Sequence, residues 1–291
     1  MEMQRIVDMS YQNFEIHPVS PAVGSEIVGL DLSKPLSDEA KTELLDAWHD
    51  RLVLFFRDQE LTADQFKTFA KNFGEIEIYP FIRKKEGTTD VERLDVETTP
   101  VMAPPTTILH VDISSFEIPS KGALLYAVDV PDAGHDTIWA NLYAAYEALS
   151  EPMQEFLVGK SALYLPMDVV TRDLFMKAGP EGPEKFARFL KSPPCEHPMV
   201  ITHPDTGRRA LFIDPLRMWS ITGLNWEESE ALIGMLNNHV NKPEFQCRLH
   251  WKAGTVAVWD NRVTLHKRVG DPASKREMHR LPIAGTAPPS L

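Results

Sequence analysis

Apolar and polar residues alternate along much of this chain with the period of two that is typical of β-strands. The strand-like runs are short, and turn sequences such as Asp205-Thr206-Gly207 and Lys252-Ala253-Gly254 bound several of them. Strands are predicted at Leu52–Phe56, Gly122–Val128, Asp136–Trp139, Arg209–Ile213, Phe245–Trp251, Thr255–Trp259 and Met278–Ile283. Many short strands with few helices favour a mainly β protein with flanking helices, arranged as a double-sheet jelly roll.

A few segments have the periodicity or the end signals of helices instead. Thr62 with Gln65 fits a capping box, Asn225 with Glu228 suits a helix start, and Gly74 is expected to follow the end of the helix that begins at Thr62. The predicted helices are Ser37–Asp50, Thr62–Phe73, Tyr143–Gly159 and Trp226–Val240.

Two long stretches lack both periodicities. Residues 79–107 are rich in proline, and residues 166–194 are irregular. We interpret both as loops of the kind that often form lids over a ligand site. The chain has 291 residues and no obvious internal repeat. Because all-β folds often use this length as one unit, a single domain over residues 1–291 is predicted.

Composition and charge exclude several classes of protein. The formal net charge is −12 and the pI is about 5.3, so a nucleic-acid partner is not expected. No glycine-rich phosphate loop follows a strand, which argues against nucleotide-binding folds. Apolar runs are too short to span a membrane, and the first residues do not resemble a secretory signal. The two cysteines form no disulfide framework, which favours a reducing, cytoplasmic compartment.

Candidate metal ligands come from three positions. His110 and Asp112 would face the same side of a strand, so an imidazole and a carboxylate could meet one ion. Alone, such a pair is more often a surface feature. The same spacing recurs in His203-Pro204-Asp205, where the proline and the turn sequence favour a hairpin tip instead. His266 is the candidate third ligand, because two histidines and one carboxylate leave open the positions that non-haem iron(II) oxygenases use.

These residues belong to a wider set of motifs along the chain. The set comprises His110-x-Asp112, Gly134-His135-Asp136-Thr137, Trp259-Asp260-Asn261-Arg262 with His266, and Arg276-x-x-x-Arg280. Together they resemble the taurine dioxygenase / 2,4-dichlorophenoxyacetate dioxygenase family from about Phe14 to Gly285. The resemblance implies a double-stranded β-helix fold and an enzyme that uses iron(II), 2-oxoglutarate and O₂. It also implies a homo-oligomer, because members often form dimers or tetramers.

The resemblance further implies roles for individual residues. His110, Asp112 and His266 would bind iron, while Thr137 and Arg276 would hold the distal carboxylate of 2-oxoglutarate. Arg280 would meet an anionic group on the substrate. Arginine suits both tasks, because it stays charged and offers a planar fork to a carboxylate. The intact carboxylate Asp112 argues against a halogenase, in which its absence makes room for halide.

The substrate is less defined than the reaction. Tyr79 stands where taurine dioxygenase has a substrate-binding histidine, and Leu109 stands where the family usually has tryptophan. These departures put taurine itself in doubt. The predicted activity is oxidation of a C–H bond of a small anionic molecule, of the sulfonate, carboxylate or aryloxyalkanoate type, with release of succinate and CO₂. The same chemistry on a larger apolar natural product is the first alternative.

Two further interpretations do not require 2-oxoglutarate. A metal hydrolase or isomerase could use the same two histidines and carboxylate, for example with zinc, but Arg276 and Thr137 would then have no evident task. A binding protein with a degenerate site is the other interpretation. The intact set of metal ligands and the two arginines argue against it.

Overall fold

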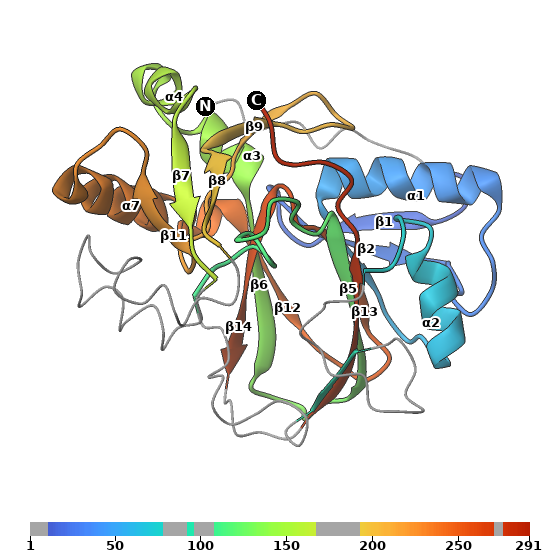
Figure 1. Cartoon of the computed structure of the whole chain (residues 1–291). Coiled ribbons are helices and arrows are strands. Elements are labelled where there is room, and N and C mark those ends of the chain that lie inside the picture. Colours follow the sequence, from blue (N-terminus) through green and yellow to red (C-terminus); the bar gives the residue numbers. More distant parts are fainter. Residues whose placement is uncertain (1–10, 78–91, 96–107, 167–192, 271–275) are drawn as a thin grey trace.

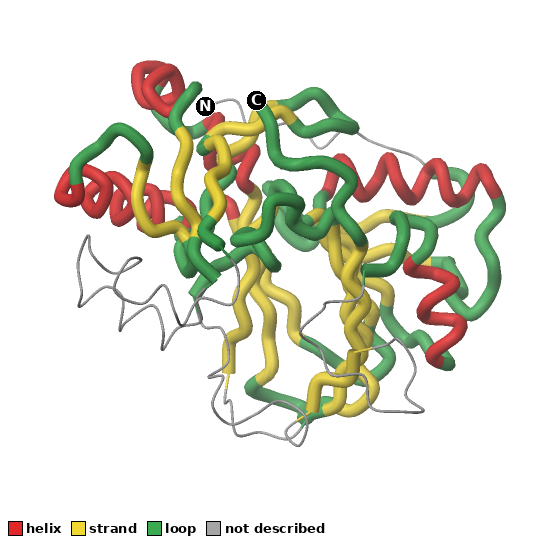
Figure 2. Tube along the Cα trace, in the orientation of Figure 1, coloured by secondary structure: helices red, strands yellow, loops and turns green. Residues whose placement is uncertain are grey.

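The computed structural model describes residues 11–77, 92–95, 108–166, 193–270 and 276–291. Strands occupy the middle of the molecule, and helices lie mainly on its two sides (Figures 1 and 2). Two sheets carry the residues of interest. The predicted mainly β jelly roll with flanking helices is therefore confirmed.

The larger sheet has seven strands. In order across the sheet they are β1 (Glu15–Pro18), β2 (Ser25–Val28), β3 (Val53–Phe56), β13 (Val256–Asp260), β5 (Gly122–Asp129), β15 (Glu277–Ile283) and β4 (Glu92–Asp95). β2 and β3 are parallel, and the other neighbours are antiparallel. The central strand β13 is buried on both faces, which explains its continuous apolar sequence.

The second sheet has three strands and supplies most of the site. Its order is β12 (Gln246–His250), β6 (His135–Asn141) and β14 (Thr264–Gly270). Shorter strands extend the structure beyond it: β7 (Ser161–Tyr164), β8 (Cys195–Pro198) and β11 (Met218–Ile221) form one sheet, and β9 (Val200–Thr202) pairs with β10 (Arg209–Leu211).

The core has two layers, one on each face of the larger sheet. Along β13, Ala257 and Trp259 point to the main core, whereas Val256 and Val258 point to the layer under the helices. This alternation follows directly from the period of two in a strand. On β15, Met278 joins the main core, so Arg280, two residues later, faces the same interior.

Helices close the two sides of the fold. α1 (Asp38–Arg51) and α2 (Ala63–Ala70) cover the outer face of the larger sheet, as Figure 1 shows. α7 (Trp226–Val240) packs against β11 on the other side. The capping box predicted at Thr62 is present, and the helix start predicted at Asn225 is confirmed, where Asn225 and Glu228 also form a capping box.

Three local predictions were wrong. The segment expected to be one helix from Tyr143 to Gly159 forms two, α3 (Leu142–Glu147) and α4 (Glu151–Leu157). Pro152 lies in the first turn of α4, where a proline without an N–H starts a helix but cannot continue the preceding one. The helix predicted over Thr62–Phe73 is shorter than expected. α2 ends at Ala70 with its C-cap at Lys71, so Gly74 does not directly follow the helix.

The third error concerns the stretch 79–107, which was interpreted as a continuous loop. Residues Glu92–Asp95 form β4, because they pair with β15 at the edge of the larger sheet. The rest of that stretch and residues 167–192 of the second expected loop lie outside the described residues. Within the described segments, no helix is long and apolar enough to cross a membrane.

Candidate active site

His110 and His266 are joined by a reciprocal pair of backbone hydrogen bonds. The N–H of His110 donates to the carbonyl of His266 at 3.0 Å, and the N–H of His266 donates back at 2.9 Å. Residues paired in this way in an antiparallel ladder present their side chains to the same face. The two ring centroids are 4.2 Å apart. Two residues far apart in the chain therefore place their imidazoles side by side.

Asp112 brings a carboxylate to the same point. Its Oδ1 lies 3.9 Å from Nε2 of His110, and its Oδ2 lies 3.7 Å from Nε2 of His266. One ligand atom from each of the three residues lies within 4.8 Å of the others. All three residues are buried. His110 forms only an isolated bridge and Asp112 lies in a turn, so simple strand alternation is not what brings them together.

The protonation of this cluster suits a divalent cation. Nδ1 of His110 lies 3.1 Å from the carbonyl of Ile108 and donates to it, which leaves the Nε2 lone pair free. Burial lowers the pKa of His110, and burial together with the nearby charges of His110 and Arg280 lowers that of His266 to about 3. Burial opposes ionisation of Asp112, but Arg280 and the imidazoles outweigh it and hold its pKa well below the usual value. Two neutral imidazoles and one carboxylate result.

Asn261 fixes the backbone of Asp112. Its side-chain oxygen accepts the Asp112 N–H at 2.9 Å, and its Nδ2 donates to the Asp112 carbonyl at 3.1 Å and to the Ser120 carbonyl at 2.9 Å. Asn261 is fully buried. Its amide thus takes the place of a strand partner for the turn that carries the carboxylate.

A second support for this turn comes from Asp214, which is also fully buried. Its Oδ2 accepts the hydroxyl of Ser114 at 2.5 Å and the N–H of Val111 at 3.3 Å. Arg217 pairs with the same oxygen at 3.1 Å and donates to the Val111 carbonyl at 2.8 Å. The residues on both sides of Asp112 are therefore held by one buried acid.

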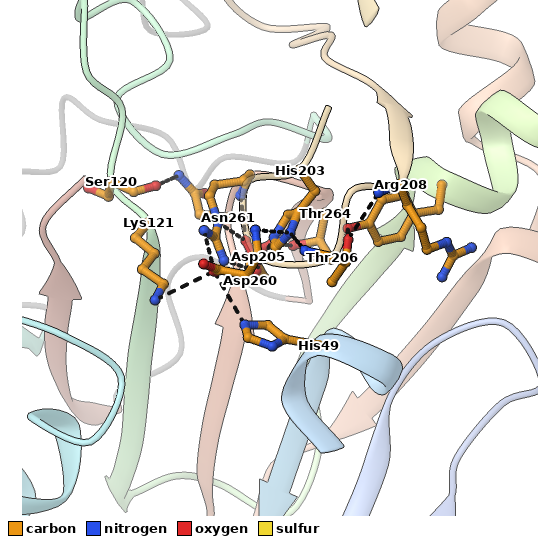
Figure 3. A network of polar contacts seen from close by, with 12 residues as sticks. His49, Ser120, Lys121, His203, Asp205, Thr206, Arg208, Asp260, Asn261 and Thr264 are labelled. Carbon is orange, nitrogen blue, oxygen red and sulfur yellow. Dashed lines mark hydrogen bonds and ion pairs between the residues drawn. The ribbon is translucent and has the colours of Figure 1, made fainter. Parts of the chain in front are cut away.

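A buried polar network lies next to Asn261 (Figure 3). Asp260 is 0% exposed and accepts Arg262 Nη2 at 2.6 Å, with His203 Nε2 at 3.0 Å from the same oxygen. Arg262 also reaches Asp205 at 2.8 Å. The pair His203 and Asp205 thus belongs to the turn between β9 and β10, as predicted, and contributes no ligand to the metal cluster. The network anchors the turn from which β14 carries His266.

Arg280 reaches the cluster from β15 of the larger sheet. Its Nη2 lies 2.5 Å from Oδ2 of Asp112, as an ion pair without hydrogen-bond orientation. Glu77 is also close enough to act on Arg280; its Oε2 accepts the Ser120 hydroxyl at 2.5 Å, and burial raises its pKa. The guanidinium of Arg280 therefore lies directly beside the carboxylate of Asp112, a candidate metal ligand.

The residues expected to bind the co-substrate lie further along the same interior. The hydroxyl of Thr137 accepts the indole N–H of the buried Trp251 at 2.9 Å. Because indole only donates, the Thr137 proton is left to donate to another group. Arg276 immediately precedes β15, and the described residues supply no ion-pair partner for it. The pairing of β15 with β5 shifts register between Glu277 and Met278, so even spacing along the chain does not by itself place Arg276 on the same face as Arg280.

Other expectations fared differently. Tyr79 lies outside the described residues. Trp259 packs against His266, with ring centroids 4.9 Å apart. Asp214 and Arg217 were missed, because no local signal links a residue some hundred positions away to the turn it supports. The contact between Trp251 and Thr137 was missed as well, because a tryptophan in a strand is usually assigned to the hydrophobic core.

A jelly roll that gathers two imidazoles and a carboxylate at one buried point has the architecture of the non-haem iron oxygenases. Comparison with known proteins gives the same class. The family model described as "Taurine catabolism dioxygenase TauD, TfdA family" matches residues 15–281. The chain belongs to this family.

Individual relatives are similar over almost their full length. An alpha-ketoglutarate-dependent sulfate ester dioxygenase from Pseudomonas putida is 34% identical over 279 residues, which covers 94% of this chain and 90% of that protein. The crystal structure of a taurine dioxygenase from Burkholderia xenovorans has a TM-score of 0.79 at 31% identity and covers 95% of this chain and 91% of that one. The structure of AAD-2 in complex with Mn(II) and N-oxalylglycine has a TM-score of 0.78 at 27% identity, covering 96% of this chain and 99% of that one.

The protein is accordingly an iron(II)- and 2-oxoglutarate-dependent dioxygenase that acts on a small molecule. The expectations for reaction class and cofactors are confirmed. The hydrolase and binding-protein interpretations are not favoured.

Proposed function

We propose that His110, Asp112 and His266 are the iron ligands of this enzyme. The observation that carries the assignment is the convergence of one ligand atom from each residue to within 4.8 Å. Oδ2 of Asp112 is buried and accepts no hydrogen bond in the described part of the chain; its neighbours are Nη2 of Arg280 and Nε2 of His266. Two imidazole nitrogens and a buried carboxylate oxygen form a donor set that fits iron(II).

Thr137 and Arg276 are the proposed anchors for the distal carboxylate of 2-oxoglutarate. Arg276 supports this role because it is a partly buried cation for which the described residues supply no acidic partner. Thr137 supports it because Trp251 occupies its acceptor position and leaves the hydroxyl proton to donate. A carboxylate would satisfy both groups at once.

Arg280 is the proposed contact for an anionic group of the substrate. It faces the interior from β15 and lies 2.5 Å from Asp112, so an anion bound to it would present its neighbouring carbon to the metal. The sulfate ester and taurine dioxygenases described above act on molecules with a sulfur oxyanion. A sulfate ester or sulfonate is therefore the first substrate class proposed, and carboxylates of the aryloxyalkanoate type are the second.

Iron(II) with 2-oxoglutarate and O₂ would supply oxidation of a substrate C–H bond, with succinate and CO₂ as by-products. This chain's own residues hold and orient the reactants. The neutral imidazoles of His110 and His266 and the ionised carboxylate of Asp112 would provide three protein ligands to the metal. Asn261 and Asp214 keep Asp112 in place, and Arg280 orients the substrate. When the oxidised carbon bears oxygen, sulfur or nitrogen, the hydroxylated product would fragment to a carbonyl compound and release sulfate from a sulfate ester, sulfite from a sulfonate, a phenol from an aryloxyalkanoate, or an amine.

The assignment can be tested in two measurements. Under anaerobic conditions, iron(II) and 2-oxoglutarate should give a visible charge-transfer band with the wild-type protein and none with Asp112→Ala. In air, a panel of sulfate esters, sulfonates and aryloxyalkanoates is screened for substrate-stimulated succinate. Asp64→Ala, at a side chain that is 91% exposed, serves as the control and should behave as wild type. Turnover that survives Asp112→Ala undiminished would contradict the proposed ligand set.

The same screen decides between substrate classes. Stimulation only by large apolar compounds would favour the natural-product alternative and remove the proposed task of Arg280. Two features of the cellular context also stay predictions: a homo-oligomer, which gel filtration with light scattering tests, and a cytoplasmic location, which fractionation tests.

A further inference from the structure

The inner face of the smaller sheet carries an arginine that neither the motifs nor the proposed function uses. In the ladder between β14 and β6, His266 is opposite Trp139 and Arg268 is opposite Thr137. His266 and Arg268 are two residues apart on one strand, so both face the site. Side chains directly opposite in an antiparallel pair have Cβ atoms about 5 Å apart. The Cβ atom of Arg268 therefore lies beside that of Thr137.

A contact further along β6 defines the course of the Arg268 side chain. Its Nη2 donates to Nδ1 of His135 at 3.1 Å. His135 is buried and lies two residues before Thr137, on the same face of β6. The guanidinium thus lies along the inner face of the strand, within reach of the groups around Thr137. The neighbouring Lys267 faces away and contacts Asn241 at 3.3 Å.

Arg276, the residue before β15 of the larger sheet, lies near enough to Arg268 to be affected by its charge. Burial and the positive charge of Arg268 lower the pKa of Arg276 to about 10, and the described residues supply no acidic partner for Arg276. Two neighbouring guanidiniums repel each other unless an anion lies between them. A carboxylate is also the group whose two oxygens match the planar donors of arginine.

We propose that Arg268 is a second arginine of the co-substrate pocket, which binds the distal carboxylate of 2-oxoglutarate together with Arg276 and Thr137 and selects for a dianionic 2-oxo acid. This inference rests on the proposed co-substrate site. It adds a specificity residue on β14, two positions after the metal-ligand candidate His266. Trp251 and His135 are the positioning residues, since they orient Thr137 and Arg268.

The test measures binding without turnover. The protein is loaded with Mn(II), and the dissociation constants of 2-oxoglutarate and of 2-oxopentanoate are compared by calorimetry. 2-Oxopentanoate has the same chelating end but lacks the distal carboxylate. Arg268→Met should weaken 2-oxoglutarate about tenfold or more and change 2-oxopentanoate less than about twofold. Arg268→Lys should recover part of the loss. Lys267→Met, the adjacent cation that faces away, should change neither ligand.

The outcomes distinguish a failure of the role proposed for Arg268 from a failure of the proposed co-substrate site. Equal weakening of both ligands, or no weakening of either, overturns the role of Arg268, because only a contact with the distal carboxylate separates them. If Arg268→Met does not fold, the separation between the two ligands is sought in Arg268→Lys and Arg268→Gln, and its absence there overturns the inference. Wild-type protein that fails to bind 2-oxoglutarate would instead contradict the proposed co-substrate site itself.

Discussion

The side-chain amide of Asn261 is hydrogen-bonded to both backbone groups of Asp112, at 2.9 Å to the N–H and 3.1 Å to the carbonyl. An amide that both accepts and donates in this way fixes the peptide planes on either side of the carboxylate. Asn261 lies at the end of β13, and Asp112 lies in a turn after His110. The residue that follows the central strand of the larger sheet therefore positions Asp112, a candidate metal ligand in a turn outside that sheet.

Replacement of Asn261 by alanine should weaken metal binding and lower kcat together. The Asp112 turn would lose both hydrogen bonds, and supporting groups of this kind typically contribute 10–100-fold to metal affinity or activity. The dissociation constant for Mn(II), the kcat and the KM for 2-oxoglutarate are measured. Asn241→Ala, at an exposed asparagine, is the control. Unchanged Mn(II) affinity in Asn261→Ala would contradict a role in holding Asp112.

Removal of the Arg280 guanidinium should act on the substrate far more than on the co-substrate. Arg280→Ala is expected to raise the KM for an anionic substrate at least tenfold, since charge-assisted hydrogen bonds contribute about 1.5–3 kcal/mol. The KM for 2-oxoglutarate should stay within about threefold. Arg248→Ala removes an exposed arginine and serves as the control. A larger effect on 2-oxoglutarate than on the substrate would reverse the assignments of Arg280 and Arg276.

Trp251 should contribute to 2-oxoglutarate binding through Thr137. Trp251→Phe removes the indole donor at 2.9 Å from the Thr137 hydroxyl, and the KM for 2-oxoglutarate should rise about three- to tenfold. Thr137→Val should have a similar or larger effect. Because both residues act on one carboxylate, the double variant should lose less than the product of the single effects. Fully multiplicative losses would show that the two residues act independently.

The buried acid Asp260 should make stability depend on acid pH. Burial opposes its ionisation, but Arg262 and His203 outweigh that effect and hold its pKa far below the usual value. A carboxylate with a depressed folded-state pKa stabilises the protein above its unfolded pKa of about 4, and this contribution is lost as the pH falls below it.

Asp260→Asn should therefore lower the free energy of unfolding at pH 7 by about 3 kcal/mol, since it removes the buried charge partner of Arg262 and leaves that residue only the more exposed Asp205. It should also reduce the loss of stability between about pH 4 and pH 2. Urea unfolding of the metal-free protein at several pH values measures both effects. Asp64→Asn, at an exposed pair, should leave the profile unchanged. An unaltered acid limb in Asp260→Asn would assign the acid sensitivity to other groups.

The sequence was sufficient to predict the residues of the site, but not the residues that hold them in place. Even spacing on a strand would have pointed from His266 to Arg268, because both lie on β14, whereas the same rule did not hold for His110 and Asp112, which lie at an isolated bridge and in a turn. Asp214 and Arg217 had no such signal. Their partner Val111 lies 106 residues from Arg217, and only tertiary contact relates them. The edge strand Glu92–Asp95 was likewise invisible, because its pairing with β15 supplies what its sequence pattern lacks.

Local patterns determined the central strands of the larger sheet, the capped helices and the residue types able to bind iron and an anion, because side-chain periodicity and donor chemistry are properties of short segments. The tertiary structure alone decided that His110 and His266 share a backbone bridge, that Asn261 holds Asp112, and that Arg268 is paired opposite Thr137. Those relationships join strands from distant parts of the chain. The free energy that selects them comes from packing two sheets together, which no short segment contains.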